Sequence, residues 1–183
     1  MTYTLPTTVE INGHEYAVRS DFRAILDILE AVNDVELDGQ ERAAVMLSVF
    51  YPDFESMPAS DYEGAITKCL WFINCGQMED KSKKPKKLVD WQQDFPVIVA
   101  PVNRVMGTEV RLLEYLHWWT FIGAYQEIGG NCLFAQIVSI RQKLANGKAL
   151  DKSEKEFYRS NRNLVDLKQQ YTEWENGLIH KWV

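Results

Sequence analysis

Residues 9–32 read VEINGHEYAVRSDFRAILDILEAV, and this stretch decides the fold because a strand pattern and a helix pattern follow each other within it. Asn12-Gly13 separates two short strand-like runs, and this dipeptide readily takes the positive φ angles of a two-residue hairpin turn. After Ser20, which we expect to cap a helix, apolar residues recur at helical spacing over 21–33. The sequence therefore predicts a β-hairpin followed by helices.

Two further helices are expected in the first half of the chain. Asp38 and Glu41 have the spacing of a capping box, in which each residue binds the other's backbone N–H at the start of a helix. Ser60 and Glu63 repeat this spacing before a third helix that we expect to end at Gly76. The first 76 residues are thus interpreted as a hairpin and a helical subdomain.

The second half carries four more helical patterns. We expect them over 90–106, closed by Gly107 and kinked at Pro101, over 113–128, over 133–147, and from about 153 to beyond Trp174. Together these patterns predict a mainly α (α+β) fold, a multi-helix bundle with a short N-terminal β-hairpin. The domain boundaries that we predict are 1–76, a lysine-rich linker or loop over 77–87, and a C-terminal helical subdomain over 88–183.

Charge and cysteine content restrict the function classes. The formal net charge is −6 and the pI is about 5.1, which disfavours binding to nucleic acid or to an anionic membrane. The lysines between Lys81 and Lys87 are favoured as a solvated linker over a binding patch. Three cysteines without a Cys-x-x-Cys spacing indicate a reducing compartment, and the polar start of the chain and its short apolar runs predict neither a signal peptide nor a membrane span.

Few residues have a spacing that favours catalysis or metal binding. His14, His117 and His180 are far apart, so we expect no metal site, and His117 is interpreted as a hydrogen-bonded structural group. Cys132, at an expected helix start, is the candidate reactive thiol, with a packing role favoured. The acid pairs at 90/94 and 154/156 are favoured as first-turn helix residues. With no phosphate-binding glycine motif, we predict no cofactor and no enzymatic activity.

Aromatic side chains are more numerous than many domains of this size need for packing. Trp and Tyr often anchor protein interfaces, so we predict that at least one aromatic cluster is exposed for a partner. Core packing remains the alternative for any single ring. The candidate partner-binding residues are Tyr115, Trp118, Trp119, Phe121, Tyr125 and Trp174.

Several segments also resemble a phage protein family. The opening LPTTVEING at 5–13 with SDFR at 20–23 resembles small tail proteins of phages and prophages of Gram-positive bacteria. The later segments resemble the "gene product fifteen" family of long-tailed (siphovirus) phages: DWQQD at 90–94, YLHWWTF at 115–121, IVSIR at 137–141 and EFYR at 156–159.

The resemblance implies a gene between those of the major tail protein and the tape-measure protein, where tail assembly chaperones are encoded. It therefore implies a chaperone that binds the tape-measure protein, and other tail proteins with it, in the cytoplasm of the host bacterium. An open edge of the hairpin could pair with a second copy, so a homo-oligomer is a further expectation. The alternative is a structural component of the virion tail or neck.

Overall fold

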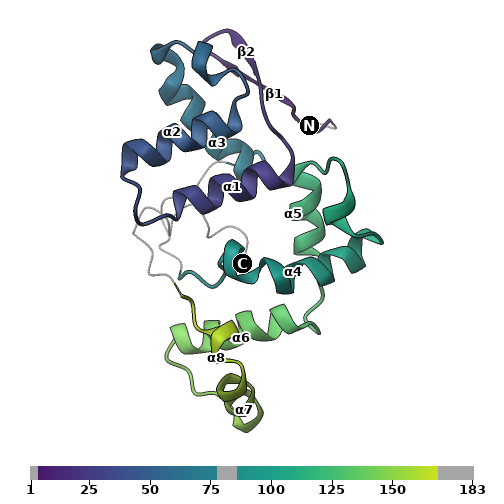
Figure 1. The fold of residues 1–183 in the computed structure, drawn as a ribbon. Coiled ribbons are helices and arrows are strands. Elements are labelled where there is room, and N and C mark those ends of the chain that lie inside the picture. The colour runs from purple at the N-terminus through teal and green to yellow at the C-terminus, as the bar shows by residue number, and fades with distance from the viewer. Residues whose placement is uncertain (1–3, 78–85, 169–183) are drawn as a thin grey trace. The chain divides into compact units, whose positions relative to one another are not determined.

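The computed structural model describes residues 4–77 and 86–168, and this part of the chain is mainly helical. It is 61% helical, with eight α-helices and an antiparallel N-terminal hairpin, which confirms the predicted fold class. The strands are β1 (Thr8–Ile11) and β2 (His14–Ala17), and the longer helices are α1 (Phe22–Val32), α2 (Gly39–Phe50), α3 (Tyr62–Ile73), α4 (Trp91–Met106), α5 (Trp118–Gln126), α6 (Leu133–Ala145) and α7 (Lys152–Ser160), as Figure 1 shows. The shorter elements are α8 (Arg162–Val165) and the 3₁₀ turns η1 (Phe54–Ser56), η2 (Ala59–Asp61) and η3 (Val110–Leu112).

The chain divides into two compact units, each made of two segments. Unit 1 contains Met1–Lys83 and Leu113–Ile122, and unit 2 contains Lys84–Leu112 and Gly123–Val183. Residues of α5 therefore belong to both. The linker that we predict over 77–87 stays a prediction, because residues 78–85 lie outside the described part of the chain.

The hairpin forms around the predicted Asn12-Gly13 turn. Asn12 and Gly13 have φ angles of 51° and 83°, and Ile11 pairs with His14 directly beside them. The side chains of Val9 and Ile11 are buried, because alternate residues of a strand point to the same face and one face of this hairpin packs against the protein. The hairpin is therefore determined by local signals, as predicted.

Helix α1 has the predicted apolar stripe but a different cap. The buried residues of α1 include Phe22, Ile25 and Leu29, which recur at helical spacing. The capping side chain is Asp21, whose carboxylate accepts from the Arg23 N–H, so the prediction of Ser20 as the N-cap was wrong.

The capping box of α2 is present as predicted, whereas that of α3 is not. Asp38 accepts from the Glu41 N–H, and Glu41 accepts from the Asp38 N–H. At the start of α3 the N-cap is Asp61, which makes no capping hydrogen bond. Its carboxylate instead accepts from the Asn12 amide at 2.9 Å and the Tyr16 hydroxyl at 2.6 Å, so it binds the hairpin rather than its own helix.

Residues 113–117 are not helical, which corrects our prediction of one helix over 113–128. The Phe22 N–H donates to the Leu116 carbonyl at 2.9 Å, and the Leu116 N–H donates to Asp21 Oδ2 at 2.9 Å. A helix would use these backbone groups for its own hydrogen bonds. Because the start of α1 uses them instead, α5 begins only after this extended segment.

Unit 2 is built on α4 and α6. Gly107 closes α4 with a φ of 68°, as predicted, and Pro96 and Pro101 lie inside the helix. The predicted kink at Pro101 stays a prediction. One buried cluster of this unit contains Ile137, Ile140, Leu150 and Val165, with Val97, Phe157, Tyr158 and Leu164 packed against it.

The C-terminal helical pattern is shorter than we predicted. Helix α7 is capped by Asp151 and Glu154 and ends at Ser160, where Asn161 donates its side-chain amide to the Phe157 carbonyl. The chain then makes the short helix α8, which brings Val165 into the buried cluster. Tyr171 and Trp174, which we expected on this helix, lie outside the described residues.

Candidate functional site

His117 is held in one tautomer by two hydrogen bonds. Nδ1 accepts from the Trp119 N–H at 3.0 Å, so Nε2 carries the proton and donates to the Pro6 carbonyl at 2.9 Å. The side chain is buried, and burial lowers the pKa of His117 although the bond to Pro6 opposes this shift. As predicted, His117 is a hydrogen-bonded structural group, and it joins the first turn of α5 to the N-terminal segment.

The three cysteines lie in different settings. The Cys132 sulfur accepts from the Ala135 N–H at 3.4 Å and caps α6, instead of packing as an apolar residue of its first turn as we favoured. Burial raises the pKa of Cys75 to about 12 and also raises the pKa of Cys69. Because the thiolate is the reactive form, Cys69 and Cys75 are poor nucleophiles at neutral pH.

Asp90 and Glu154 serve the starts of their helices, as predicted, whereas Glu156 lies beyond the first turn of α7. Asp90 accepts from the Gln93 N–H at 2.8 Å and caps α4, and Glu154 belongs to the capping box of α7. The Lys143 ammonium lies beside the Glu154 carboxylate and lowers its pKa. What the sequence did not indicate is the partner of Asp94.

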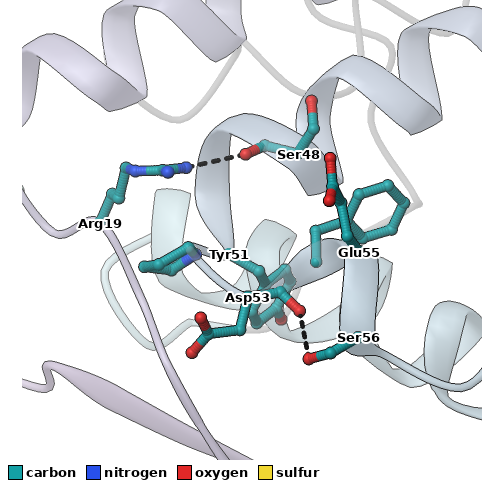
Figure 2. Close-up of a pocket in the computed structure, with 8 residues that line it drawn as sticks. Arg19, Ser48, Tyr51, Asp53, Glu55 and Ser56 are labelled. Carbon is teal, nitrogen blue, oxygen red and sulfur yellow. Dashed lines mark hydrogen bonds between the residues drawn. The ribbon is translucent and has the colours of Figure 1, made fainter.

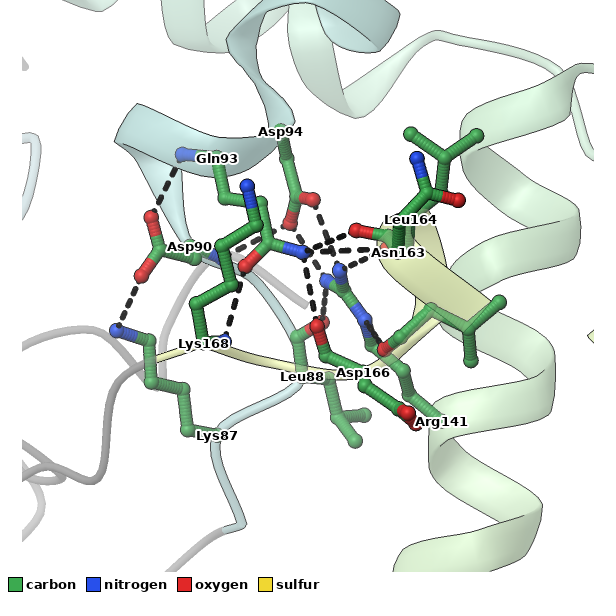
Figure 3. Close-up of polar contacts among 11 residues, drawn as sticks. Lys87, Leu88, Asp90, Gln93, Asp94, Arg141, Asn163, Leu164, Asp166 and Lys168 are labelled. Atoms are coloured by element: carbon green, nitrogen blue, oxygen red, sulfur yellow. Dashed lines mark hydrogen bonds and ion pairs between the residues drawn. The ribbon is translucent and has the colours of Figure 1, made fainter. Parts of the chain in front are cut away.

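Asp94 forms a buried ion pair with Arg141 in unit 2 (Figure 3). Arg141 donates to both Asp94 oxygens, at 2.6 and 2.9 Å, and its other bonds go to the carbonyls of Leu88, Leu164 and Val165. All five donor hydrogens of a guanidinium can be used in this geometry. The pair therefore joins the segment before α4, α4 itself, α6 and α8.

Gln93, one residue before Asp94, extends this network (Figure 3). Its amide nitrogen lies within 3.0 Å of the Asp166 carbonyl, and its amide oxygen accepts from the Lys168 N–H at 3.1 Å. Gln93 and Asp94 lie in the segment DWQQD, and Arg141 ends the segment IVSIR. The segments that carry the family resemblance thus supply contacts that maintain the fold.

The six predicted partner-binding residues do not form one surface. The rings of Trp118, Phe121 and Tyr125 are buried, with 0%, 0% and 5% of their surface exposed, so they present no area to a partner in this structure. Tyr115 is 53% exposed, and Trp119 is partly exposed. Trp174 lies outside the described residues, so its role stays a prediction.

Trp119 lies next to Trp71, which we had not predicted as a site residue. The ring centroids are 5.6 Å apart in an edge-on arrangement, and the Lys68 ammonium lies 5.9 Å from the Trp71 centroid. The two tryptophans and Lys68 are all partly exposed. We call these three side chains the Trp71–Trp119 surface.

Local structure holds both rings in place. The Trp119 indole N–H donates to the Phe72 carbonyl at 2.8 Å, near the C-terminal end of α3. Gly76 follows with a φ of 79°, and a Cβ there would lie 3.2 Å from the Trp119 ring and 3.5 Å from the Trp71 ring. The Trp119 ring is therefore held by its own chain against the Trp71 ring, which lowers the entropy that it loses on binding.

A sequence signal for Trp71 was available. The buried residues of α3 include Ala65, Cys69 and Phe72, which form the inward face of this helix. Trp71 lies off that face, and a tryptophan outside the buried stripe of a helix is a candidate for contact with a partner.

Unit 1 also contains a polar pocket of about 590 Å³ (Figure 2). Its lining comes from the hairpin exit, the end of α2 and η1: Arg19, Ser48, Tyr51, Pro52, Asp53, Phe54, Glu55 and Ser56. The Tyr51 hydroxyl donates to the Ala65 carbonyl, and burial raises the pKa of Tyr51. In the lining of the pocket, Arg19 Nη1 donates to the Ser48 carbonyl oxygen at 2.8 Å (Figure 2).

The described residues contain neither a metal-ligand cluster nor a membrane-spanning helix. Between residues 4 and 77 and between 86 and 168, no three His, Cys, Asp or Glu side chains gather as a metal would require. Over the same residues, no helix has the length and apolar character needed to cross a bilayer.

Comparison with known protein families gives a match over most of the chain. The model of the family described as "Bacteriophage Gp15 protein" matches residues 1–167 of the 183 in this chain. Neither a curated protein nor a solved structure matches the chain.

Proposed function

Because this chain belongs to the bacteriophage Gp15 protein family, we propose that it is a non-enzymatic tail assembly chaperone that binds the tape-measure protein in the cytoplasm of the host bacterium. The family membership supports a phage protein. The gene position implied by the resemblance supports the assembly role over other phage functions.

The observation that carries the proposal is the Trp71–Trp119 surface. Two partly exposed tryptophans, held edge-on by a hydrogen bond and by the close approach of Gly76, offer preorganised apolar area. Tryptophans of this kind are frequent hot spots of protein interfaces. A tape-measure protein is a long helical chain with apolar stripes, and an aromatic surface can cover such a stripe.

The side chains suited to chemistry support a binding role as well. His117 has both ring nitrogens in hydrogen bonds, Cys132 caps a helix, and Asp94 is paired with Arg141. Each of these groups already has a structural partner. A catalytic group must also lie within hydrogen-bond reach of its substrate, and none of these three side chains lines the described pocket of unit 1.

Co-expression with the neighbouring tape-measure gene, followed by affinity capture, tests the proposal. We expect the wild-type chain to retain the tape-measure protein, and Trp71→Ala to lower retention several-fold because the edge-on contact and its exposed area are lost. Leu144→Ala is the matched control, since it removes a 41% exposed apolar side chain from α6. A thermal melt of each variant checks that it folds; equal retention by both variants would contradict the proposal.

The structural alternative makes a different prediction for purified phage particles. A chaperone is released during assembly, so mass spectrometry of mature particles should find no stoichiometric amount of this chain. Detection at a fixed copy number per tail would instead identify a component of the virion and overturn the chaperone role.

A further inference from the structure

Unit 1 carries a large excess of negative charge. Its described residues include 14 acidic and 4 basic side chains, a net charge of −10, whereas those of unit 2 include 8 acidic and 12 basic side chains, a net charge of +4. The whole-chain value of −6 conceals this asymmetry. A surface with such an excess attracts cationic groups and repels anionic ones.

The four basic side chains of unit 1 are already engaged by their own chain. Arg19 donates to the Ser48 and Val49 carbonyls, and Lys68 lies over the Trp71 ring. Arg23 binds the Asp21 carboxylate and the Leu113 carbonyl, and Arg42 binds the Asp34 carbonyl. Arg19 is the basic residue among the side chains that line the pocket of unit 1.

Two of those carboxylates line the pocket of unit 1. Asp53 and Glu55 are exposed, and neither carboxylate accepts a hydrogen bond from the described residues. Phe54 between them is partly exposed, whereas Tyr51, the other aromatic side chain of the lining, is buried. The pocket thus combines two exposed carboxylates with the ring of Phe54.

Arg19 does not make the pocket a site for an anion. Its guanidinium is directed to the last carbonyls of α2, where it compensates the negative end of that helix (Figure 2). The Asp53 and Glu55 carboxylates in the same view are free of such bonds. The charged side chains of the lining are Arg19, Asp53 and Glu55, so its formal charge is −1, and only the two carboxylates lack a hydrogen-bond partner among the described residues.

We propose that this pocket binds a lysine or arginine side chain from a segment of a partner protein. The cation would be attracted by Asp53 and Glu55, while its aliphatic stem or guanidinium plane would pack against the aromatic lining. Charge complementarity with a net −10 unit selects a cation over an apolar or anionic side chain. The proposal goes beyond the chaperone role, because it does not depend on which protein supplies the segment.

NMR titration of the full-length ¹⁵N-labelled chain tests this inference. The probes are Nα-acetyl-lysine methylamide, its arginine counterpart, and Nα-acetyl-norleucine methylamide, which matches the aliphatic stem of lysine without its charge. We expect the two cationic probes to shift the backbone amides of residues 48–56, and the norleucine probe to leave them in place.

Two double variants separate the pocket from the general field of unit 1. Asp53→Asn with Glu55→Gln should weaken binding of the cationic probes by about threefold or more, in line with the loss of two exposed ion pairs. Asp27→Asn with Glu36→Gln removes the same two charges from exposed positions outside the pocket and should leave binding nearly unchanged. Equal weakening by both pairs, equal shifts by norleucine, or cation-induced shifts away from residues 48–56 would each overturn the assignment.

Discussion

Arg141 and Asp94 form a bidentate ion pair in which both side chains are almost fully buried, with 4% and 2% of their surface exposed. Arg141 also donates to the Leu88 carbonyl, which precedes α4, and to the Leu164 and Val165 carbonyls at the end of α8. One side chain therefore connects segments that are more than 70 residues apart in sequence at their extremes, from Leu88 to Val165.

Replacing Asp94 by Ala should strongly destabilise unit 2. The change leaves the Arg141 charge buried without its carboxylate, which typically costs about 3–5 kcal/mol. Urea unfolding followed by circular dichroism would measure the loss. Arg162→Ala is the control, because its ion pair with Asp166 is exposed and its removal should leave the midpoint nearly unchanged. Equal midpoints for the two variants would contradict the role of the buried pair.

Protonation of His117 should destabilise the fold as the pH falls below about 6.5. Burial lowers the pKa of His117 in the folded chain, so the unfolded chain takes up the proton at a higher pH than the folded chain does. The free energy of unfolding therefore keeps its full value above the pKa of the unfolded chain. It declines as the pH falls from that pKa toward the pKa of the folded chain. Urea midpoints at pH 7.5 and 5.5 measure this loss. The carboxylates with lowered pKa, Asp61, Glu109 and Glu154, lose their contribution only at lower pH.

His117→Gln should flatten this pH dependence, since the amide keeps a donor for the Pro6 carbonyl but does not titrate. His14→Gln is the comparison variant: the His14 ring lies 3.5 Å from the Asp61 carboxylate, so this variant measures the contribution of the other described histidine. An unchanged slope in the His117 variant would show that another group causes the pH dependence.

Gly76→Ala should disturb the Trp71–Trp119 surface. The residue has a φ of 79°, and its new Cβ would lie 3.2 Å from the Trp119 ring. Gly107→Ala is the matched control: its φ is 68°, but nothing lies within 4 Å of the new Cβ. Both should lose about 1–2 kcal/mol from backbone strain, and only Gly76→Ala should also change tryptophan fluorescence and partner capture. Identical fluorescence in the two variants would argue against the crowding.

Asp21→Ala should cost more stability than Ser20→Ala. Asp21 caps α1 and also accepts from the Leu116 N–H, so about 2 kcal/mol is expected from losing both roles. Ser20 shares one hydrogen bond with the Tyr115 hydroxyl, worth about 1 kcal/mol. Thermal melts of the two variants rank them, and the reverse order would restore Ser20 as the more important residue.

Features set by neighbouring residues could be predicted from the sequence. The Asn12-Gly13 turn, the capping box of Asp38 and Glu41, and the closure of α4 at Gly107 depend on φ preferences and on side chains within four residues. The apolar stripe of α1 is local in the same sense, because its helical spacing alone identifies the buried face. These signals sufficed for the fold class.

Features that depend on distant backbone groups could not be predicted in this way. The apolar run after Leu113 has the composition of a helix, yet its first residues stay extended because Asp21 and Phe22 bind Leu116. Asp61 fails to cap α3 because Asn12 and Tyr16 of the hairpin occupy its carboxylate.

The candidate site shows the same division. Composition indicated that aromatic surface was in excess, but it did not indicate which rings the core would take. The tertiary structure buries Trp118 and Phe121 and leaves Trp119 partly exposed beside Trp71. By itself, then, the sequence determined the hairpin, the presence of the helices, the capping box of α2 and the closure of α4, since these arise from interactions a few residues apart. The exposure of each ring and the long-range hydrogen bonds were decided only by the tertiary structure, because they depend on which distant segments pack against a residue.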